Sequence, residues 1–361
     1  MSRQSGVRAR MAVAAAAVLA VGVTLTACAP ADDAVSGSSA APATGFPVTI
    51  DNCGTTQTFT EPPSRVLVMR GASVGEVESL IELGVQDSII ANTQNYGVSD
   101  IPGMAERVDA VPTGGLTLAD SGDVSAEQIL ALRPDLVIST WSGGFDPKYG
   151  SATRATLGQA GIRTLVTPVN CAYGKPGQVS AAERAAYRNG STESSAEFLE
   201  LLGKIYGRPD RGTAAANRLR DRIRAVGQRV EGRPVKRMLV VFPGMSAMNA
   251  AGLPAVMSGS IYDSVVRAAG GEPSFPDGGA DLTSSLSAER LAGAEVDVLV
   301  VGGSRAGEDL DARARELFAR YPQWNASKTR SYVTVSDGVY YGPANADAVE
   351  KIARVAHPDA F

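Results

Sequence analysis

The sequence predicts an α/β protein of two lobes that are joined by one long helix, with a ligand cleft between the lobes. Short apolar runs rich in Val, Ile and Leu alternate with segments of helical periodicity along most of the chain. The segment 209–231 carries no proline after Pro209 and could form a helix of about 33 Å, long enough to bridge two lobes. A weak internal repeat relates 124–138 to 286–300: both run Ser-Ala-Glu, helix, Asp and apolar strand, 162 residues apart.

The first lobe, 46–207, is expected to contain four strands and four helices. The predicted strands are 65–69, 88–91, 135–139 and 163–166, and the predicted helices are 74–83, 125–132, 152–160 and 193–206. The segment 172–190 is polar with a Lys-Pro-Gly turn, and we expect an irregular surface excursion there.

The second lobe, 233–361, repeats the pattern after a bridging helix at 208–232. Strands are predicted at 236–242, 296–301 and 332–335, and helices at 261–269, 287–291, 310–321 and 344–356. Two similar α/β lobes that face each other leave a cleft, which is where small ligands bind.

The first residues predict processing rather than fold. Arg3, Arg8 and Arg10 precede an apolar run, and Leu25-Thr26-Ala27-Cys28 follows it, so 1–27 is expected to be a lipoprotein signal peptide with Cys28 as the lipidated N-terminus. A plain secretory peptide with a chance cysteine is the alternative. Residues 28–45 are rich in Ala, Ser, Pro and Gly and are expected to be a flexible leash.

Charge and cysteine content narrow the function classes. Without the three leader arginines, 31 basic residues face 38 acidic ones, a net charge near −7, and no basic cluster is interleaved with aromatics, which argues against nucleic acid. Beyond Cys28 the chain has two cysteines, Cys53 and Cys171, and in an oxidising compartment we expect them to form a disulfide. Two free thiols or a thiolate site are the alternative.

Residues that catalysis or metal binding would need are scarce. The chain has one histidine, His357, which disfavours a zinc or manganese site and histidine-held haem, and leaves haem ligation by Tyr or Met open. No G-x-S-x-G, Walker A or strand-linked G-x-G-x-x-G motif occurs. We therefore expect that the protein is not an enzyme and holds no resident cofactor. A secreted α/β hydrolase is the remaining enzymatic alternative.

An ordered set of motifs then resembles a known family. A lipobox and leash precede Asn52-Cys53-Gly54, Pro62-Pro63-Ser64-Arg65-Val66, the first Ser-Ala-Glu repeat with Arg-Pro-Asp135, and Ala269-Gly-Gly271-Glu before the second Ser-Ala-Glu. Together they resemble the periplasmic binding proteins that serve iron–siderophore and cobalamin ABC importers. The resemblance, over about 47–360, implies two Rossmann-like lobes and a rigid interlobe helix. It also implies that Glu127 and Glu289 dock the permease, although both glutamates also suit a helix first turn.

Candidate ligand contacts follow the predicted strands, since ligands of open α/β sheets bind beyond the carboxyl ends of the strands. We expect these contacts in the loops 70–73, 92–96, 141–149, 243–248, 303–305 and 340–341. The candidates within them are Arg70, Ser73, Asn92, Tyr96, Trp141, Phe145, Met245, Arg305 and Tyr340. Arg70 and Arg305 could pair with an anionic ferric chelate, and Trp141 with Phe145 could form an aromatic rim.

The sequence therefore predicts a monomeric, lipid-anchored extracytoplasmic protein that captures a ferric siderophore and delivers it to an ABC permease. Cobalamin, haem or another cofactor-like molecule is the alternative ligand, and the lipid anchor is the only expected contact with the membrane.

Overall fold

The computed structural model describes residues 45–94, 96–116, 124–149, 151–276, 278–279 and 281–361. The predicted signal peptide, Cys28 and nearly all of the leash lie outside the described residues. Among the described residues, no helix is both long enough and apolar enough to cross a membrane.

The first lobe is built on a parallel four-stranded sheet of order β4-β3-β5-β6. Its strands are β3 (Val66–Val68), β4 (Ile89–Asn92), β5 (Leu136–Ser139) and β6 (Arg163–Val166). An antiparallel hairpin of β1 (Val48–Asn52) and β2 (Thr55–Phe59) precedes them and is not in the sequence prediction. The helices are α1 (Gly75–Glu82), α2 (Met104–Asp109), α3 (Ala126–Leu132), α4 (Arg154–Gln159), α5 (Ala181–Arg188) and α6 (Thr192–Ile205).

The second lobe is built on a five-stranded mixed sheet. Its strands are β7 (Lys236–Phe242), β8 (Ala255–Met257), β9 (Gly271–Pro273), β10 (Val298–Gly302) and β11 (Tyr332–Val335). β10 and β11 run parallel to β7 on one side, while antiparallel β8 and parallel β9 share its other edge. The helices are α8 (Ser260–Ala268), α9 (Leu282–Ser285), α10 (Ala288–Ala292), α11 (Leu310–Arg320), α12 (Asn325–Thr329) and α13 (Asn345–Ala356).

Both sheets are buried on both faces, which explains the continuous apolar runs of the sequence. In β5, Leu136 and Ile138 enter one core and Val137 enters the core on the opposite face. In β7, Val240 and Val241 divide in the same way between two cores. The mixed α/β architecture predicted from the sequence is confirmed.

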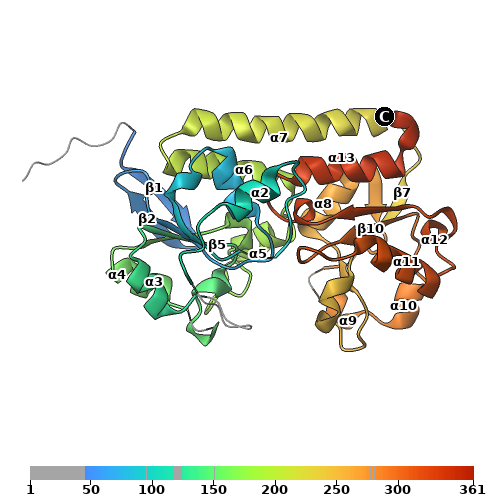
Figure 1. Ribbon diagram of the computed structural model, residues 1–361, viewed down its shortest axis with the longest axis horizontal. Helices are drawn as coiled ribbons and strands as arrows, with labels where there is room; N and C mark the ends of the chain where they lie inside the picture. Colours follow the sequence, from blue (N-terminus) through green and yellow to red (C-terminus); the bar gives the residue numbers. More distant parts are fainter. Residues whose placement is uncertain (1–44, 95, 117–123, 150, 277, 280) are drawn as a thin grey trace, which may run out of the picture. The chain divides into compact units, whose positions relative to one another are not determined.

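The helix α7 (Pro209–Val230) packs against both lobes. Its first half contributes Ala216 and Leu219 to the core of the first lobe, and its last turns contribute Val226 and Val230 to the core of the second. Ile223, between them, packs against both cores. Figure 1 shows α7 running alongside α6 and α13, which belong to different lobes. The exact lobe boundaries, 46–207 and 233–361, stay a prediction.

The internal repeat has a structural counterpart in its two aspartates. Asp135 Oδ2 accepts hydrogen bonds from the backbone N–H of Ser64 (2.8 Å) and Arg65 (3.0 Å), just before β3. Asp297 Oδ2 accepts one from the backbone N–H of Arg237 at 2.9 Å, at the start of β7. Each aspartate therefore ties the start of its own strand to the neighbouring central strand.

The segment 172–190 differs from the expected irregular excursion, because it contains helix α5. Ser180 accepts from the backbone N–H of Glu183, and the Glu183 side chain accepts from the backbone N–H of Ser180. This capping box and the alanine-rich stretch that follows it account for the helix.

Candidate ligand-binding cleft

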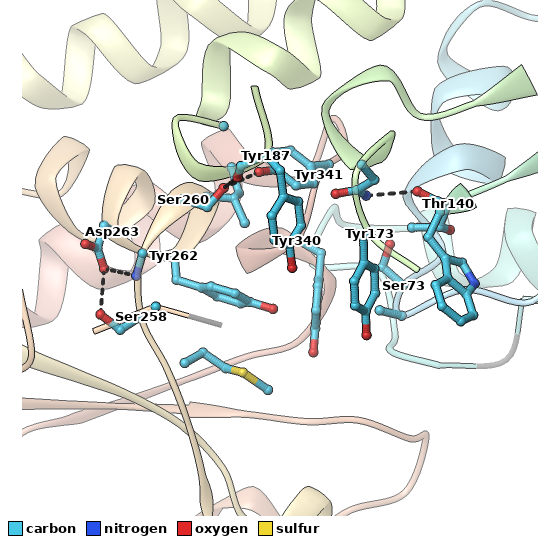
Figure 2. Close-up of a pocket in the computed structure, with 18 of the residues that line it drawn as sticks. Ser73, Thr140, Tyr173, Tyr187, Ser258, Ser260, Tyr262, Asp263, Tyr340 and Tyr341 are labelled. Carbon is cyan, nitrogen blue, oxygen red and sulfur yellow. Dashed lines mark hydrogen bonds between the residues drawn. The ribbon is translucent and has the colours of Figure 1, made fainter. Parts of the chain in front are cut away.

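A cavity of about 1430 Å³ lies between the lobes and is lined by residues of both. Eight of its lining residues are aromatic: Tyr96, Trp141, Tyr149, Tyr173, Tyr187, Tyr262, Tyr340 and Tyr341. Figure 2 shows the phenol groups of Tyr173, Tyr262 and Tyr340 directed toward a common space. The cavity exceeds the size usual for sites of drug-sized ligands, so it suits a larger guest.

Part of the lining follows the carboxyl ends of parallel strands, as expected for open α/β sheets. Arg70 and Ser73 come after β3, Trp141 after β5, and Met245 after β7. Ser73 is buried, and its Oγ accepts from the backbone N–H of Gly75 at 3.2 Å, at the start of α1.

On the second lobe the lining is a group of phenols. The rings of Tyr262 and Tyr340 meet edge to face with centroids 5.7 Å apart, and the Tyr340 hydroxyl lies 3.9 Å from Met245 Sδ. The Tyr341 hydroxyl and Ser260 Oγ are 2.6 Å apart. Burial raises the pKa of Tyr341 to about 12 and raises that of Tyr340 above its usual value. Both phenols are therefore neutral at physiological pH.

On the first lobe, aromatic rings from three stretches of chain adjoin one another. The Trp141 ring centroid lies 5.3 Å from that of Tyr149 and 5.0 Å from that of Tyr173. Tyr173 in turn stacks on Tyr187, with centroids 5.7 Å apart and an interplanar angle of 10°. These distances are typical of favourable aromatic pairs.

Three arginines near the cleft pack on an aromatic ring or pair with acids. The guanidinium groups of Arg70 and Arg305 lie 5.2 and 5.8 Å from the ring centroid of Tyr96. Arg267 lies 3.5 Å from Asp263 and makes a second contact of 3.3 Å to Glu272.

A buried polar network supports the loop after β5. Gln94 Nε2 donates to Glu76 Oε2 at 2.7 Å and to the cavity-lining Thr140 Oγ1 at 3.3 Å, and Thr167 Oγ1 donates to Glu76 Oε1 at 2.5 Å. Burial raises the pKa of the Glu76 carboxyl, and these hydrogen bonds act in the opposite direction. The network fixes Thr140 in position.

Six of the predicted contacts line the cavity: Arg70, Ser73, Tyr96, Trp141, Met245 and Tyr340. Phe145, Asn92 and Arg305 do not. The stretch Ser142–Phe145 forms a 3₁₀ turn that buries Phe145 in a core behind β5. Asn92 is buried, and its Oδ1 accepts from the backbone N–H of Gln94 at 2.9 Å. Arg305 is exposed and packs on the ring of Tyr96.

The prediction omitted three lining aromatics, Tyr173, Tyr187 and Tyr262. Tyr149 and Tyr341 line the cavity and lie in two of the predicted loops, 141–149 and 340–341, which follow strands β5 and β11. Tyr173 and Tyr187 lie in the segment expected to be a surface excursion. The sequence feature that could have indicated them is the presence of two tyrosines in the polar stretch that follows Cys171.

The disulfide predicted from the sequence is present between Cys53 and Cys171. Cys53 lies in the β1–β2 turn, and Cys171 lies two residues before the cavity-lining Tyr173.

Glu127 and Glu289 occupy equivalent positions, each the second residue of its helix, α3 or α10. Both are exposed, and within the described residues neither makes a side-chain hydrogen bond or ion pair. Ser125 and Ser287 cap the two helices, and Ser125 forms a capping box with Gln128. In the described part of the chain, no cluster of three or more His, Cys, Asp or Glu side chains could hold a metal ion.

Solved structures of several binding proteins share this fold. A protein of an Fe³⁺-hydroxamate transport system from Saccharomonospora viridis is 22% identical, with a TM-score of 0.63 over 86% of this chain and 99% of its own. A periplasmic haem-binding protein from Roseiflexus sp. RS-1 is 19% identical, with a TM-score of 0.58 over 82% of this chain and 99% of its own. A periplasmic vitamin B12 binding protein of Vibrio cholerae is 18% identical, with a TM-score of 0.55 over 81% of this chain and 96% of its own.

No curated protein sequence matches the chain significantly. Residues 73–332 match the sequence model of a family described as periplasmic binding protein. The matched stretch includes parts of both lobes and all of α7. With its two α/β lobes, its α7 helix and its cleft, the chain belongs to the periplasmic binding protein family.

Proposed function

We propose that the protein lies outside the cytoplasm, captures a ferric siderophore in the cleft between its lobes, and delivers it to an ABC permease. The observation that supports this most is the cavity of about 1430 Å³, lined by eight aromatic side chains and by arginines. Such a lining suits a large, mostly organic guest with a few polar groups. The role is binding rather than catalysis.

The charge of the cleft favours a chelate of low net charge. The described lining residues include three basic side chains, Arg70, Arg188 and Arg267, and two acidic ones, Asp263 and Asp281. Arg267 is already paired with Asp263. The neutral tyrosines add no charge. A multiply anionic ferric tris-catecholate would need more cations than these to replace its hydration. A neutral ferric trihydroxamate fits this balance better, and the similar protein from Saccharomonospora viridis belongs to an Fe³⁺-hydroxamate transport system.

Cobalamin and haem are the second candidates, because similar folds are solved for proteins that bind them. The single histidine is not available for either, since His357 is buried after α13 with its Nε2 3.1 Å from the carbonyl oxygen of Gly270. A tyrosine of the cleft would be the candidate ligand for haem iron.

Equilibrium dialysis of the mature chain, carrying Cys28→Ser to keep it free of lipid, tests the proposal. The probes are a ferric trihydroxamate, a ferric tris-catecholate, cobalamin and haem. We expect retention of one equivalent of a ferric siderophore, with the trihydroxamate bound more tightly than the tris-catecholate. Retention of cobalamin or haem alone would favour the second candidates, and retention of no probe would reject all of these ligands.

Permease docking is proposed for Glu127 and Glu289, since both are exposed at matching positions of the two lobes. Glu127→Arg and Glu289→Arg should each impair uptake of the bound chelate by cells and leave its dissociation constant unchanged. Glu106→Arg, an equal charge change at another exposed site, is the control. Loss of affinity in the first two variants would place these residues in ligand binding instead.

Lipid anchoring at Cys28 is proposed from the lipobox alone. Cells that produce the Cys28→Ser protein should release it into the soluble fraction, whereas the unchanged protein should stay with the membranes. Equal membrane association of both would contradict the proposal.

A further inference from the structure

The segment from Cys171 to Gly190, called here the Cys171–Gly190 segment, forms one wall of the cleft. Tyr173, Tyr187 and Gly190 line the cavity, and most of α5 lies between the two tyrosines. A wall that is not part of either sheet must be positioned by other contacts, and the structure supplies them at both ends.

The first end is tied to the first lobe by covalent and polar contacts. Cys171 is disulfide-bonded to Cys53, and its carbonyl oxygen accepts from Ser142 Oγ at 2.7 Å. The Tyr173 carbonyl oxygen accepts from the backbone N–H of Gly143 at 3.3 Å. These bonds fix the wall to the loop that follows β5.

A lysine closes the segment on itself. Lys175 Nζ donates to the carbonyl oxygen of Cys53 at 3.2 Å and forms a partly buried ion pair with Glu183 of α5. The same side chain therefore holds α5 and the disulfide-bonded turn together.

The far end contacts the second lobe. Ser260 Oγ lies at the start of α8, donates to the Tyr187 carbonyl oxygen at 2.9 Å and contacts the Tyr341 hydroxyl at 2.6 Å (Figure 2). Tyr187 therefore stands where the two lobes meet, at the edge of the cavity.

Two glycines make room for the Trp141 ring against this wall. A Cβ atom at Gly174 would lie 2.3 Å from the ring and one at Gly143 would lie 2.2 Å from it, so neither position accepts a side chain without moving the ring. The ring also adjoins Tyr173, with centroids 5.0 Å apart. Tyr173 itself lines the cavity and remains 51% exposed, so its ring is held by neighbours yet available.

We propose that the Cys171–Gly190 segment selects the organic scaffold of the ligand through the rings of Tyr173 and Tyr187. In this proposal the Cys53–Cys171 disulfide and Gly174 are positioning elements. The proposal rests on the proposed function and adds where recognition occurs: the rings contact the ligand's organic part and do not ligate its metal.

Substitutions at Tyr173 test the contact. Tyr173→Ala should raise the dissociation constant of the bound probe at least tenfold, because a stacking surface is lost. Tyr173→Phe should stay within twofold of the wild type, since the ring remains. Affinity lost equally in Tyr173→Phe would show that the hydroxyl carries the interaction, as in metal ligation, and would overturn the proposal.

The positioning role has a matched pair of variants. Gly174 (φ +61°) and Gly177 (φ +83°) both have left-handed backbones, so alanine is strained at either position. A Cβ at Gly177 meets nothing within 4 Å, whereas one at Gly174 meets Trp141. Only Gly174→Ala should therefore weaken probe binding, and Gly177→Ala is the control.

A measurement without ligand completes the test. In a Trp324→Phe background, Trp141 is the only tryptophan of the chain. Gly174→Ala and Cys53→Ser/Cys171→Ser should each increase quenching of Trp141 by acrylamide, while Gly177→Ala should not. Equal acrylamide quenching of Trp141 in Gly174→Ala and Gly177→Ala would overturn the positioning role.

Failure of the inference and failure of the proposed function are distinguishable. If the wild type binds a probe of the dialysis panel and Tyr173→Ala binds it equally well, only this inference is overturned. If the wild type binds no probe, the proposed function is overturned, and the selective role of the wall with it.

Discussion

The side chains of Glu78 and Asp337 come from different lobes, are both fully buried, and lie close enough for each to influence the pKa of the other. Glu78 comes from α1, and Asp337 from the turn after β11, where its Oδ1 accepts from the backbone N–H of Val74 at 2.8 Å. Both Glu78 carboxyl oxygens and Asp337 Oδ2 lack a hydrogen-bond partner among the described residues. Two neighbouring buried carboxyl groups are best accommodated when at least one of them keeps a proton, which the pair can share.

This pair predicts a pH dependence of stability. Burial is the main cause that raises the pKa of Glu78 from 4.5 to about 7, and it also raises the pKa of Asp337. Between these values the folded chain keeps a proton that the unfolded chain releases, so the free energy of unfolding falls as the pH rises from about 4.5 to about 7. The loss should be about 3 kcal/mol, at roughly 1.4 kcal/mol per unit of pKa.

Glu78→Gln removes one of the two titrating carboxyls and supplies an amide that can donate to Asp337, so it should reduce this pH dependence. Urea unfolding at pH 5 and pH 8, followed by circular dichroism, measures the difference, with Glu127→Gln as an exposed-carboxyl control. Other charges near the pair are Asp100, Asp347, Lys351 and Arg222, which are paired with one another and remain in the variant. A wild-type slope retained in Glu78→Gln would contradict the shared proton.

A second aspartate, Asp100, joins the lobes by direct hydrogen bonds. Its Oδ2 accepts from the backbone N–H of Ser336 (2.7 Å) and Gly338 (2.8 Å), and its Oδ1 lies 2.7 Å from Lys351 Nζ. Asp100→Ala leaves two buried N–H groups unsatisfied, and we expect it to cost about 3–5 kcal/mol of unfolding free energy. Asp100→Asn keeps an acceptor and should cost less. A loss no larger than that of the exposed Asp109→Ala, in chemical denaturation, would contradict this role.

Arg154 ties the β1–β2 hairpin to the first sheet. Its guanidinium donates to the carbonyl oxygen of Asn52 at 2.7 Å and to Thr164 Oγ1 at 2.8 Å. Arg154→Lys cannot reproduce this fork and should lower the unfolding free energy by about 2 kcal/mol. The exposed Arg184→Lys serves as control, and a thermal unfolding midpoint equal to the control's would refute the expectation.

Much of the fold could be predicted because both faces of each sheet are buried. Strands such as β7 and β10 are therefore continuous apolar runs, which the sequence displays plainly. The hairpin was missed because its strands alternate partly buried with exposed residues and are rich in Thr, so they resemble a polar loop. Helix α5 was missed because Ser180 and Glu183 form its capping box inside a stretch dominated by turn residues.

The candidate site could be predicted only where it follows a parallel strand. Arg70, Trp141 and Met245 were found because the carboxyl ends of parallel strands converge on one edge. Tyr187 and Tyr262 belong to α5 and α8, and their place in the cleft depends on how the lobes meet, which no local pattern records. Phe145 was misplaced because the turn that carries it, Ser142–Phe145, directs it into the core.

Fluorescence of Trp141 tests the central claim, that the cleft captures an iron chelate, most directly. In a Trp324→Phe chain it is the sole tryptophan, and its side chain lines the cavity. Titration with a ferric trihydroxamate should quench its emission saturably with one equivalent, and Tyr173→Ala should shift the midpoint to higher concentration. No change in emission with any ferric chelate, from a protein shown by circular dichroism to be folded, would contradict capture in this cleft.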